Sequence, residues 1–342
     1  MTYLQAIVIA VVQGVTELFP VSSLGHSVLV PAWLGGSWET LVTQSSQADS
    51  ASSFYLAYIV ALHCATALAL LWFFRADWVR IIRGFFSSLA RSIRERRFIV
   101  RTADERMAWL IVLATIPVGI TGLALEHVFR TVFAKPLAAS IFLFINGLIL
   151  LLGERARRST EQQQPAMATV AEPVAATVSG GGVAVAERPP ARATLRAGSG
   201  GSRSADDLEA AVASDRRIAR ISYRDGFSVG SLQVLALLPG ISRSGITMVG
   251  GLWRGLSHED AARFAFLLAT PVIFAAGVLK LPSLAGTAGD HIHGQVVVGA
   301  IITGVTAYFS VRYLVRYFET RTLTPFAIYC LIAGAASIVR FA

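Results

Sequence analysis

The residues best suited to chemistry lie close together near the start of the chain. They occur in the stretch Gln13-Gly-Val-Thr-Glu17-Leu-Phe-Pro20-Val-Ser22-Ser23-Leu-Gly25-His26. Gln13 and Glu17 are four residues apart and therefore share one helical face, and Pro20 ends that helix. The sequence around them is apolar, and ionisable side chains at membrane depth are costly. Glu17 and His26 are therefore functional candidates, and the alternative for Glu17 is a structural ion pair with an arginine.

A second polar stretch, late in the chain, suits the binding of an anion. It reads Leu238-Pro239-Gly240-Ile-Ser242-Arg243-Ser244-Gly245-Ile-Thr247. Backbone N–H groups at a helix start bind anions, and a planar guanidinium suits bidentate contact with phosphate. An arginine within an apolar segment also needs an anionic partner, which is either Glu17 or a substrate phosphate. The predicted substrate contacts are Ser22, Gly240, Ser242, Arg243, Ser244 and Thr247.

If the two stretches meet, one site holds a carboxylate, an imidazole, hydroxyls, an arginine and two helix N-termini. Phosphoryl transfer depends mostly on positioning and on neutralising charge, so this set predicts phosphoryl chemistry on a lipid with a diphosphate head. Glu17, together with Gln13, would hold a metal ion or orient a neighbouring base. The attacking group stays open between His26, Ser23 activated by His26, and water.

The rest of the chain predicts the membrane helices that position these residues. Of 342 residues, 54% are hydrophobic and only 15% are charged, which nearly excludes a water-soluble globular protein. A spanning helix needs about 20 apolar residues. The two cysteines, Cys64 and Cys330, each lie alone in an apolar stretch. Six stretches are candidate spans: 54–74, 107–125, 136–152, 264–279, 295–311 and 322–339.

The arginines predict which ends of the spans face the cytoplasm. They concentrate in the connections 75–106 and 153–226, which the positive-inside rule makes cytoplasmic loops. With that orientation, the apolar stretch 227–252 begins and ends on the cytoplasmic side and forms a re-entrant hairpin broken at Pro239-Gly240. The stretch 3–33, broken at Pro20, is either a hairpin that enters from outside or a single crossing.

The order of the elements is the same in both halves of the chain, with a broken stretch followed by three spans. Gln13, Ser22 and Gly25 also align with Gln233, Ser242 and Gly245. These features predict an all-α integral membrane protein with an inverted-topology repeat, six transmembrane helices and two re-entrant helical hairpins. The repeats are expected at 1–152 and 227–342, joined by a disordered cytoplasmic linker at 153–226 in which 205–222 could form an amphipathic helix.

Three further readings follow from the residues. The net charge of +9 comes without an aromatic-interleaved basic patch, so nucleic-acid binding is not expected. His63, within an apolar span, is interpreted as a packed or hydrogen-bonded histidine rather than a ligand. Inverted repeats with broken helices are also typical of secondary transporters, so a transporter or flippase of a lipid phosphate is the alternative function. A purely structural scaffold would leave the charged residues at membrane depth unexplained.

The two polar stretches resemble the motifs of the bacterial undecaprenyl-diphosphate phosphatase family associated with bacitracin resistance. The first motif is Glu or Gln, three residues, Glu, and then Pro-x-Ser-Ser-x-Gly-His; the second is Pro-Gly-x-Ser-Arg-Ser-x-x-Thr. The resemblance covers about 1–152 and 227–342, and the linker is not part of it. Many members have Glu where this chain has Gln13, and an amide coordinates a metal only weakly, so Glu17 should be the main carboxylate.

The resemblance also implies a reaction and its setting. The expected reaction hydrolyses undecaprenyl diphosphate to undecaprenyl phosphate and inorganic phosphate, which recycles the carrier lipid for peptidoglycan synthesis. It implies a multi-pass protein of the bacterial plasma membrane, an extracytoplasmic active site and a divalent metal, Mg²⁺ or Ca²⁺. The expected partners are the polyprenyl diphosphate and membrane lipids, and a homodimer is one of the oligomeric states left open.

Overall fold

The protein is described by a computed structural model that covers residues 1–41, 54–133, 135–168, 205–284 and 292–342. In these ranges every regular element is helical, which confirms the predicted all-α class. Among the described residues, five helices are long and apolar enough to cross a membrane. The bent pair α4 (Phe54–Phe73) and α5 (Arg75–Glu95) makes six if it is counted as one span. The chain is therefore a multi-pass membrane protein.

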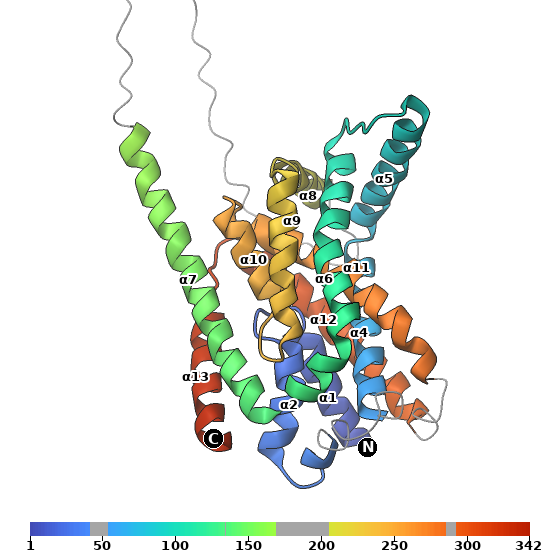
Figure 1. Cartoon of the computed structure of the whole chain (residues 1–342), viewed down its shortest axis with the longest axis vertical. Coiled ribbons are helices and arrows are strands. Elements are labelled where there is room, and N and C mark those ends of the chain that lie inside the picture. Colours follow the sequence, from blue (N-terminus) through green and yellow to red (C-terminus); the bar gives the residue numbers. More distant parts are fainter. Residues whose placement is uncertain (42–53, 134, 169–204, 285–291) are drawn as a thin grey trace, which may run out of the picture.

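Each of the six predicted spans falls within a helix or extends beyond its end by at most two residues, and these helices run side by side over much of the molecule (Figure 1). The helices are α4 (Phe54–Phe73), α6 (Ala103–Phe133), α7 (Pro136–Ala168), α11 (His258–Leu284), α12 (His293–Phe318) and α13 (Thr324–Phe341).

One predicted loop is a helix in the structure. Residues 75–95, placed in a cytoplasmic connection by their arginines, form α5 (Arg75–Glu95), which is bent by 86° from α4. Asp77, Ile81 and Ser88 are buried on one side of α5, whereas most of its arginines are exposed or half-buried. The high density of arginines favoured a loop and hid an amphipathic helix, because apolar residues and arginines alternate here with helical spacing.

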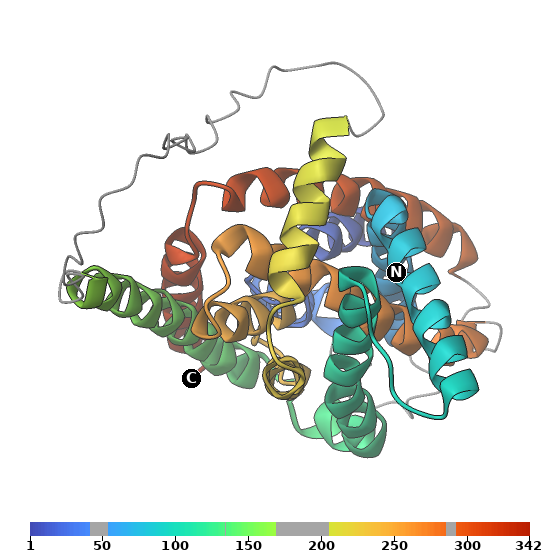
Figure 2. The ribbon, with the colours of Figure 1, turned by 90° about the horizontal axis from the view of Figure 1, so that it is seen from above.

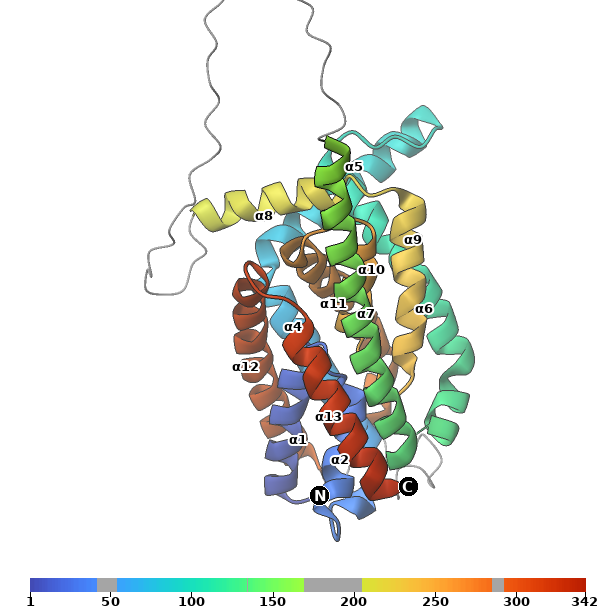
Figure 3. The same cartoon turned by 90° about the vertical axis from the view of Figure 1, so that its left-hand side faces the viewer.

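The two broken stretches are interrupted where proline and glycine predict it. In the first stretch, α1 (Tyr3–Thr16) ends before Pro20 and is followed by α2 (Ser23–Leu34). In the second stretch, α9 (Tyr223–Leu232) and the 3₁₀-helix η1 (Gln233–Leu237) end before Pro239-Gly240. They are followed by α10 (Arg243–Trp253). Figure 3 shows α1 and α2 in the lower part of the molecule and α9 and α10 in the upper part. The two interruptions therefore approach each other from opposite ends.

Helices extend into both ends of the range 153–226 that the sequence predicts as a linker. α7 continues to Ala168, and α8 (Ala205–Ile218) coincides with the expected amphipathic helix. Residues 169–204, the middle of the predicted linker, lie outside the described residues.

Seen from above, α8 lies across the bundle (Figure 2). Buried ion pairs attach it there. Asp215 of α8 accepts hydrogen bonds from Arg263 of α11 at 2.8 and 3.0 Å and from Arg80 of α5 at 2.7 Å. Arg263 also lies 3.0 Å from Asp77 of α5. This network connects the segment that precedes α9 and α10 to the membrane helices.

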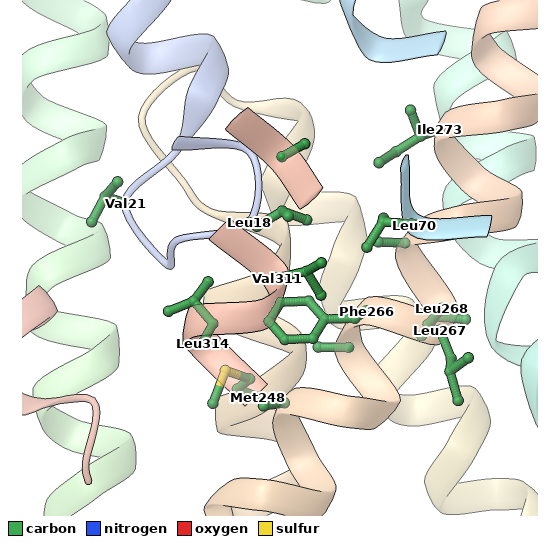
Figure 4. Packing of buried hydrophobic residues seen from close by; sticks show 14 of the residues in the cluster. Leu18, Val21, Leu70, Met248, Phe266, Leu267, Leu268, Ile273, Val311 and Leu314 are labelled. Atoms are coloured by element: carbon green, nitrogen blue, oxygen red, sulfur yellow. The ribbon is translucent and has the colours of Figure 1, made fainter. Parts of the chain in front are cut away.

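A shared apolar core joins the two interrupted segments (Figure 4). Leu18, which follows α1, and Met248 of α10 are both buried in the same cluster as Phe266 of α11 and Leu314 of α12. Since burying one such side chain contributes about 1.5–3 kcal/mol, this packing holds both interruptions at one level of the bundle.

Candidate functional site

The site is centred on an ion pair between the two interrupted segments. Arg243, the first residue of α10, donates from Nη2 to Oε1 of Glu17, which follows α1 and lies 226 positions earlier in the chain. The Glu17 side chain is 4% exposed and that of Arg243 is 17% exposed. The two loops that the sequence predicts to meet are thus in direct contact, and each buried charge has a partner, as buried charges require.

The second oxygen of the same carboxylate contacts three further side chains. Oε2 of Glu17 accepts a hydrogen bond from the Ser23 hydroxyl and one from Nε2 of Gln13 at 3.0 Å. Nε2 of His63, on α4, lies 3.3 Å from the same oxygen. Glu17 therefore stands where it can take the proton of Ser23, in the position of a general base for that hydroxyl.

His26 faces away from this cluster. Its Nδ1 donates to the carbonyl oxygen of Ser22 at 2.6 Å, and its Nε2 lies 2.7 Å from the hydroxyl of Tyr329 on α13. In the part of the chain that the structure describes, no hydrogen bond or ion pair joins His26 to Glu17, Ser23 or Arg243. Activation of Ser23 by His26, one of the three alternatives that the sequence left open, is not the arrangement observed, because the Ser23 hydroxyl points to Glu17 instead.

The loop before α2 and the loop before α10 are in direct contact through the Ser22 hydroxyl and two glycines. The Ser22 hydroxyl accepts hydrogen bonds from the N–H of Gly25 at 3.2 Å and from the N–H of Gly240 at 3.1 Å. A Cβ atom on Gly25 would lie 2.9 Å from Cα of Gly240, and Gly240 itself has a φ of +118°. Glycine is required at both positions, at one for close approach and at the other for its backbone conformation.

The start of α10 has the form predicted for an anion site. The Ser242 hydroxyl caps the helix by accepting from the N–H of Gly245 at 3.2 Å, and it lies 3.0 Å from the Ser244 hydroxyl. Nε of Arg243 and Oγ1 of Thr247 are buried and have no hydrogen-bond partner among the residues that the structure describes. Buried polar groups are rarely left unpaired in a protein, so these two donors are available to a bound anion.

Asn146 of α7 connects the two loops and is a residue that sequence reasoning missed. Its amide donates to the carbonyl oxygen of Pro20 at 3.0 Å and accepts from the N–H of Ser242 at 3.0 Å. One side chain therefore pairs a backbone group of each interruption. The signal was a single amide in the apolar span 136–152, which needs a polar partner at membrane depth.

His63 and Tyr329 were also not predicted as parts of the site. His63 is hydrogen-bonded, as the sequence indicated, through Nδ1 to the carbonyl of Ile59 at 2.8 Å, but its other nitrogen faces Glu17. Its position on an apolar helix gave no sign of that partner, since the contact depends on how α4 packs against α1. Tyr329 lies on α13, near the other end of the chain, and contacts the site only through His26.

The residues around Glu17 fit a divalent cation that prefers oxygen ligands. Oε1 of Gln13, one helical turn from the Glu17 carboxylate, is buried and finds no hydrogen-bond partner in the described part of the chain. Mg²⁺ typically uses one or two carboxylates, with waters and substrate phosphates completing its shell. Among the described residues, no group of three or more His, Cys, Asp or Glu side chains is gathered as for a fully protein-ligated metal, so substrate oxygens would have to contribute.

Comparison with known proteins gives consistent similarities along the whole chain. The family model described as bacitracin resistance protein BacA matches residues 6–175 and 174–336. An undecaprenyl-diphosphatase 2 from Frankia alni is 58% identical, with 100% of this chain and 98% of the relative covered. An undecaprenyl-diphosphatase from Mycolicibacterium paratuberculosis is 53% identical over the same shares, and one from Burkholderia lata is 38% identical over 95% of this chain and 92% of the relative.

Proposed function

The chain belongs to the bacitracin resistance protein BacA family, and we propose that it is an undecaprenyl-diphosphatase that releases inorganic phosphate and leaves undecaprenyl phosphate. The observation that carries this proposal is the cluster at Glu17. There a carboxylate, a serine hydroxyl and an arginine from the far half of the chain meet within the membrane-spanning bundle. A lipid diphosphate places its reacting group at that depth while its tail stays among lipids.

Arg243 and the start of α10 bind the diphosphate. Arginine can contact phosphate oxygens with two nitrogens at once, and Nε of Arg243 and Oγ1 of Thr247 are both unpaired. The hydroxyls of Ser242 and Ser244, the turn at Gly240 and the helix N-terminus add further donors, with Ser22 supporting the turn. Together they offset the negative charge that a diphosphate brings into a poorly solvated site.

Ser23 is the attacking group. Its Oγ forms a bond to the terminal phosphorus while its proton passes to Oε2 of Glu17, the atom it already contacts. The bond from that phosphorus to the bridging oxygen breaks, and undecaprenyl phosphate leaves. Water then cleaves the phosphoserine to give inorganic phosphate and free Ser23. His26, through its bond to the Ser22 carbonyl, positions the loop that carries Ser23.

Glu17 and Gln13 would hold the Mg²⁺ or Ca²⁺ ion that the family resemblance implies. When bound there, a divalent ion would neutralise phosphate charge next to the attacking serine. Gln13 supplies a neutral amide oxygen instead of a second carboxylate, so the protein contributes less charge to this site and substrate phosphate must contribute more.

The arrangement of the helices supports the finer topology. Two interrupted segments that approach from opposite ends, each followed by long helices, are what an inverted repeat of 1–152 and 227–342 with two re-entrant hairpins would produce. The arginine-rich α5 and the helix α8 lie at one end of the molecule (Figure 3), which the positive-inside rule assigns to the cytoplasm of the bacterial cell. The hairpin of α1 and α2 then enters from outside, and the site opens on the extracytoplasmic side.

The reaction is tested by measuring phosphate release from a polyprenyl diphosphate in detergent, with a divalent metal present. Wild type should release one phosphate per lipid, and the Glu17→Ala and Arg243→Ala variants should be nearly inactive while remaining folded. Detergent micelles have no second compartment, so transport cannot produce this signal. Absence of phosphate release by the wild type would contradict hydrolysis and leave the lipid-phosphate transporter as the better interpretation.

The attacking group is tested separately by trapping the intermediate. Rapid acid quenching with substrate labelled in the terminal phosphate should leave the label on Ser23. Phosphoserine survives acid, whereas phosphohistidine is lost in acid and survives alkali, so a parallel alkaline quench reports on His26. A label on His26 would make that residue the attacking group, and no label under either condition would favour direct attack by water.

A further inference from the structure

A pocket lined by arginines lies at the end of the bundle opposite α1 and α2, away from Glu17. It has a volume of about 600 Å³ and is bordered by the segment before α6, the first turn of α6, the end of α8 and the start of α9. Its charged lining consists of Arg101, Arg106, Arg216 and Arg220, and no acidic residue lines it. The hydrolysis reaction uses none of these residues.

The carboxylates near the pocket are already paired with arginines elsewhere. Asp104 bonds Arg80 at 3.1 Å, Glu105 bonds Arg91 at 3.1 Å, and Asp225 bonds Arg254 at 2.6 Å.

The pocket arginines have fewer ion-pair partners than these carboxylates. Among the described residues, the Arg101 guanidinium has one ion-pair partner, Glu95, at a distance of 3.7 Å. Within the described ranges, no ion pair or side-chain hydrogen bond is found for Arg216 or Arg220. The positive charge of the pocket is therefore largely uncompensated by the protein.

Two polar atoms of the pocket residues are buried and have no hydrogen-bond partner within the ranges that the structure covers. They are Nε of Arg106 and the hydroxyl oxygen of Tyr223. The Arg106 guanidinium lies 4.9 Å from the centre of the Tyr223 ring, and its Nη2 donates to the carbonyl of Ile221 at 3.0 Å, so both side chains are held in place. Burial raises the pKa of the Tyr223 hydroxyl more than Arg106 lowers it, and the group therefore remains a donor at neutral pH.

The place of the pocket in the bundle indicates what kind of anion it meets. The stretch of α6 that is apolar enough to cross a membrane begins at Ala103, which puts the pocket beside the end of a candidate span, where lipid headgroups are expected. Phe98 in the lining is 59% exposed, and Phe227, which is one helical turn beyond Tyr223 on α9, is 47% exposed. Basic pockets between helices at this level bind anionic lipid headgroups.

We propose that this pocket, formed by Arg101, Arg106, Arg216, Arg220 and Tyr223, is a binding site for the phosphate-bearing headgroup of an anionic membrane lipid. The guanidinium groups contact the phosphate, the Tyr223 hydroxyl donates to it, and the exposed phenylalanines contact the acyl chains. Phosphate is the shared chemistry of a lipid headgroup and free inorganic phosphate, and the exposed apolar rim favours the lipid.

Native mass spectrometry of the purified full chain tests the proposal with phosphatidylglycerol, phosphatidylcholine and inorganic phosphate as separate probes. Wild type should retain phosphatidylglycerol at least about tenfold more tightly than phosphatidylcholine, and the Arg216→Gln/Arg220→Gln variant should lose that preference. Arg312→Gln/Arg321→Gln removes the same charge from exposed positions on α12 and after it, and it should keep the preference. Phosphate-release activity in detergent should be unchanged in both variants.

Three outcomes would overturn the proposal: wild-type preference in the Arg216→Gln/Arg220→Gln variant, an equal loss in the control variant, or inorganic phosphate binding as tightly as phosphatidylglycerol. Tyr223→Phe gives a second test that does not alter charge. Removing a buried hydroxyl that has no partner should not lower the thermal stability of the free protein. The same variant should bind phosphatidylglycerol several-fold more weakly, and unchanged binding would exclude the hydroxyl from the site.

Discussion

At the scale of single residues, Arg243 has to bind Glu17 and still offer donors to the substrate. Its Nη2 contacts Glu17, whereas its Nε is buried and unpaired. A lysine has a single ammonium group and lacks the planar guanidinium. It therefore cannot contact Glu17 and the substrate in two fixed directions at once. We expect Arg243→Lys to lower kcat/KM by about 10²–10³-fold, the range seen when one oriented donor to a developing charge is lost.

Phosphate release measured over a range of lipid concentrations checks this expectation, with the fold verified by thermal unfolding. Because the charge is retained, simple electrostatic attraction of the substrate should persist. Turnover within a few-fold of the wild type would show that a point charge is sufficient, and the assignment of Arg243 as a phosphate clamp would be wrong.

Gln13 determines how strongly the protein alone can attract a divalent ion. Its Nε2 donates to Glu17 and its Oε1 has no partner. Replacing it with Glu adds a second carboxylate beside the first, and like charges at that spacing need a cation between them. Gln13→Glu should therefore lower the Mg²⁺ concentration that gives half-maximal activity after chelation of bound metal, by about tenfold, as an added charged ligand does in carboxylate sites.

Titration of the chelated wild type and variant with Mg²⁺, and then with Ca²⁺, measures this change. An unchanged or higher half-maximal concentration would mean that Gln13 does not face the ion. The variant without metal should also be less stable than the wild type, because two carboxylates then repel each other in a buried place.

The chemical roles of single residues could be predicted from the sequence more fully than their contacts with one another. Glu17 and Arg243 were expected to meet because each is a charge in apolar sequence and each needs the other or an anion. The partners of His26 and His63 could not be predicted, since Tyr329 and Glu17 reach them across helix packing that has no local signature. Asn146 was within reach of the same rule that identified Glu17, because it too is polar at membrane depth.

At the scale of elements, the approach of α2 to α10 depends on the absence of a side chain. A Cβ on Gly25 would lie 2.9 Å from Cα of Gly240, closer than such atoms normally come. Gly25→Ala must push the two helix starts apart or distort one of them, at a cost of about 1–3 kcal/mol. Because Ser23 and Arg243 lie on these same turns, we expect activity to fall by at least an order of magnitude.

Gly119→Ala is the matched control for this change. Gly119 lies within α6, and a Cβ there would meet nothing within 4 Å. That substitution should leave activity unchanged and raise stability slightly, since alanine favours a helix. Equal behaviour of the two variants, in phosphate release and in thermal unfolding, would show that the two helix starts tolerate separation.

The interruptions were the most predictable elements, and the surface helices were less so. Proline and glycine mark the ends of η1 and α1 directly in the sequence. α5 was predicted as loop because its arginines dominate the composition, although Asp77 and Ile81 on its buried side follow helical spacing. Positive charge indicates the side of the membrane but does not distinguish a loop from a helix that lies along the surface.

At the scale of the whole molecule, the ion network beneath α8 connects the segment leading to Arg243 with the first half of the chain. Asp215 bonds Arg263 and Arg80 and is 1% exposed, and Arg263 is 8% exposed. Removing one member leaves a buried charge with too little compensation, which typically costs about 3–5 kcal/mol. Asp77 also contacts Arg263, so the loss for Asp215→Ala should fall near the lower end, at about 3 kcal/mol.

Asp225→Ala is the control on which this prediction is judged. Its pair with Arg254 is well formed at 2.6 Å, but the two side chains are 30% and 41% exposed. Exposed pairs contribute about 1 kcal/mol or less, so thermal unfolding in detergent should show a clear shift for Asp215→Ala and almost none for Asp225→Ala.

Below its unfolding transition the Asp215→Ala protein should also lose activity, because α8 precedes α9 and α10 and its detachment loosens the start of α10 that holds Arg243 against Glu17. If the two variants unfold at the same temperature, the buried network does not hold α8, and the position of Arg243 must depend on packing within the membrane alone.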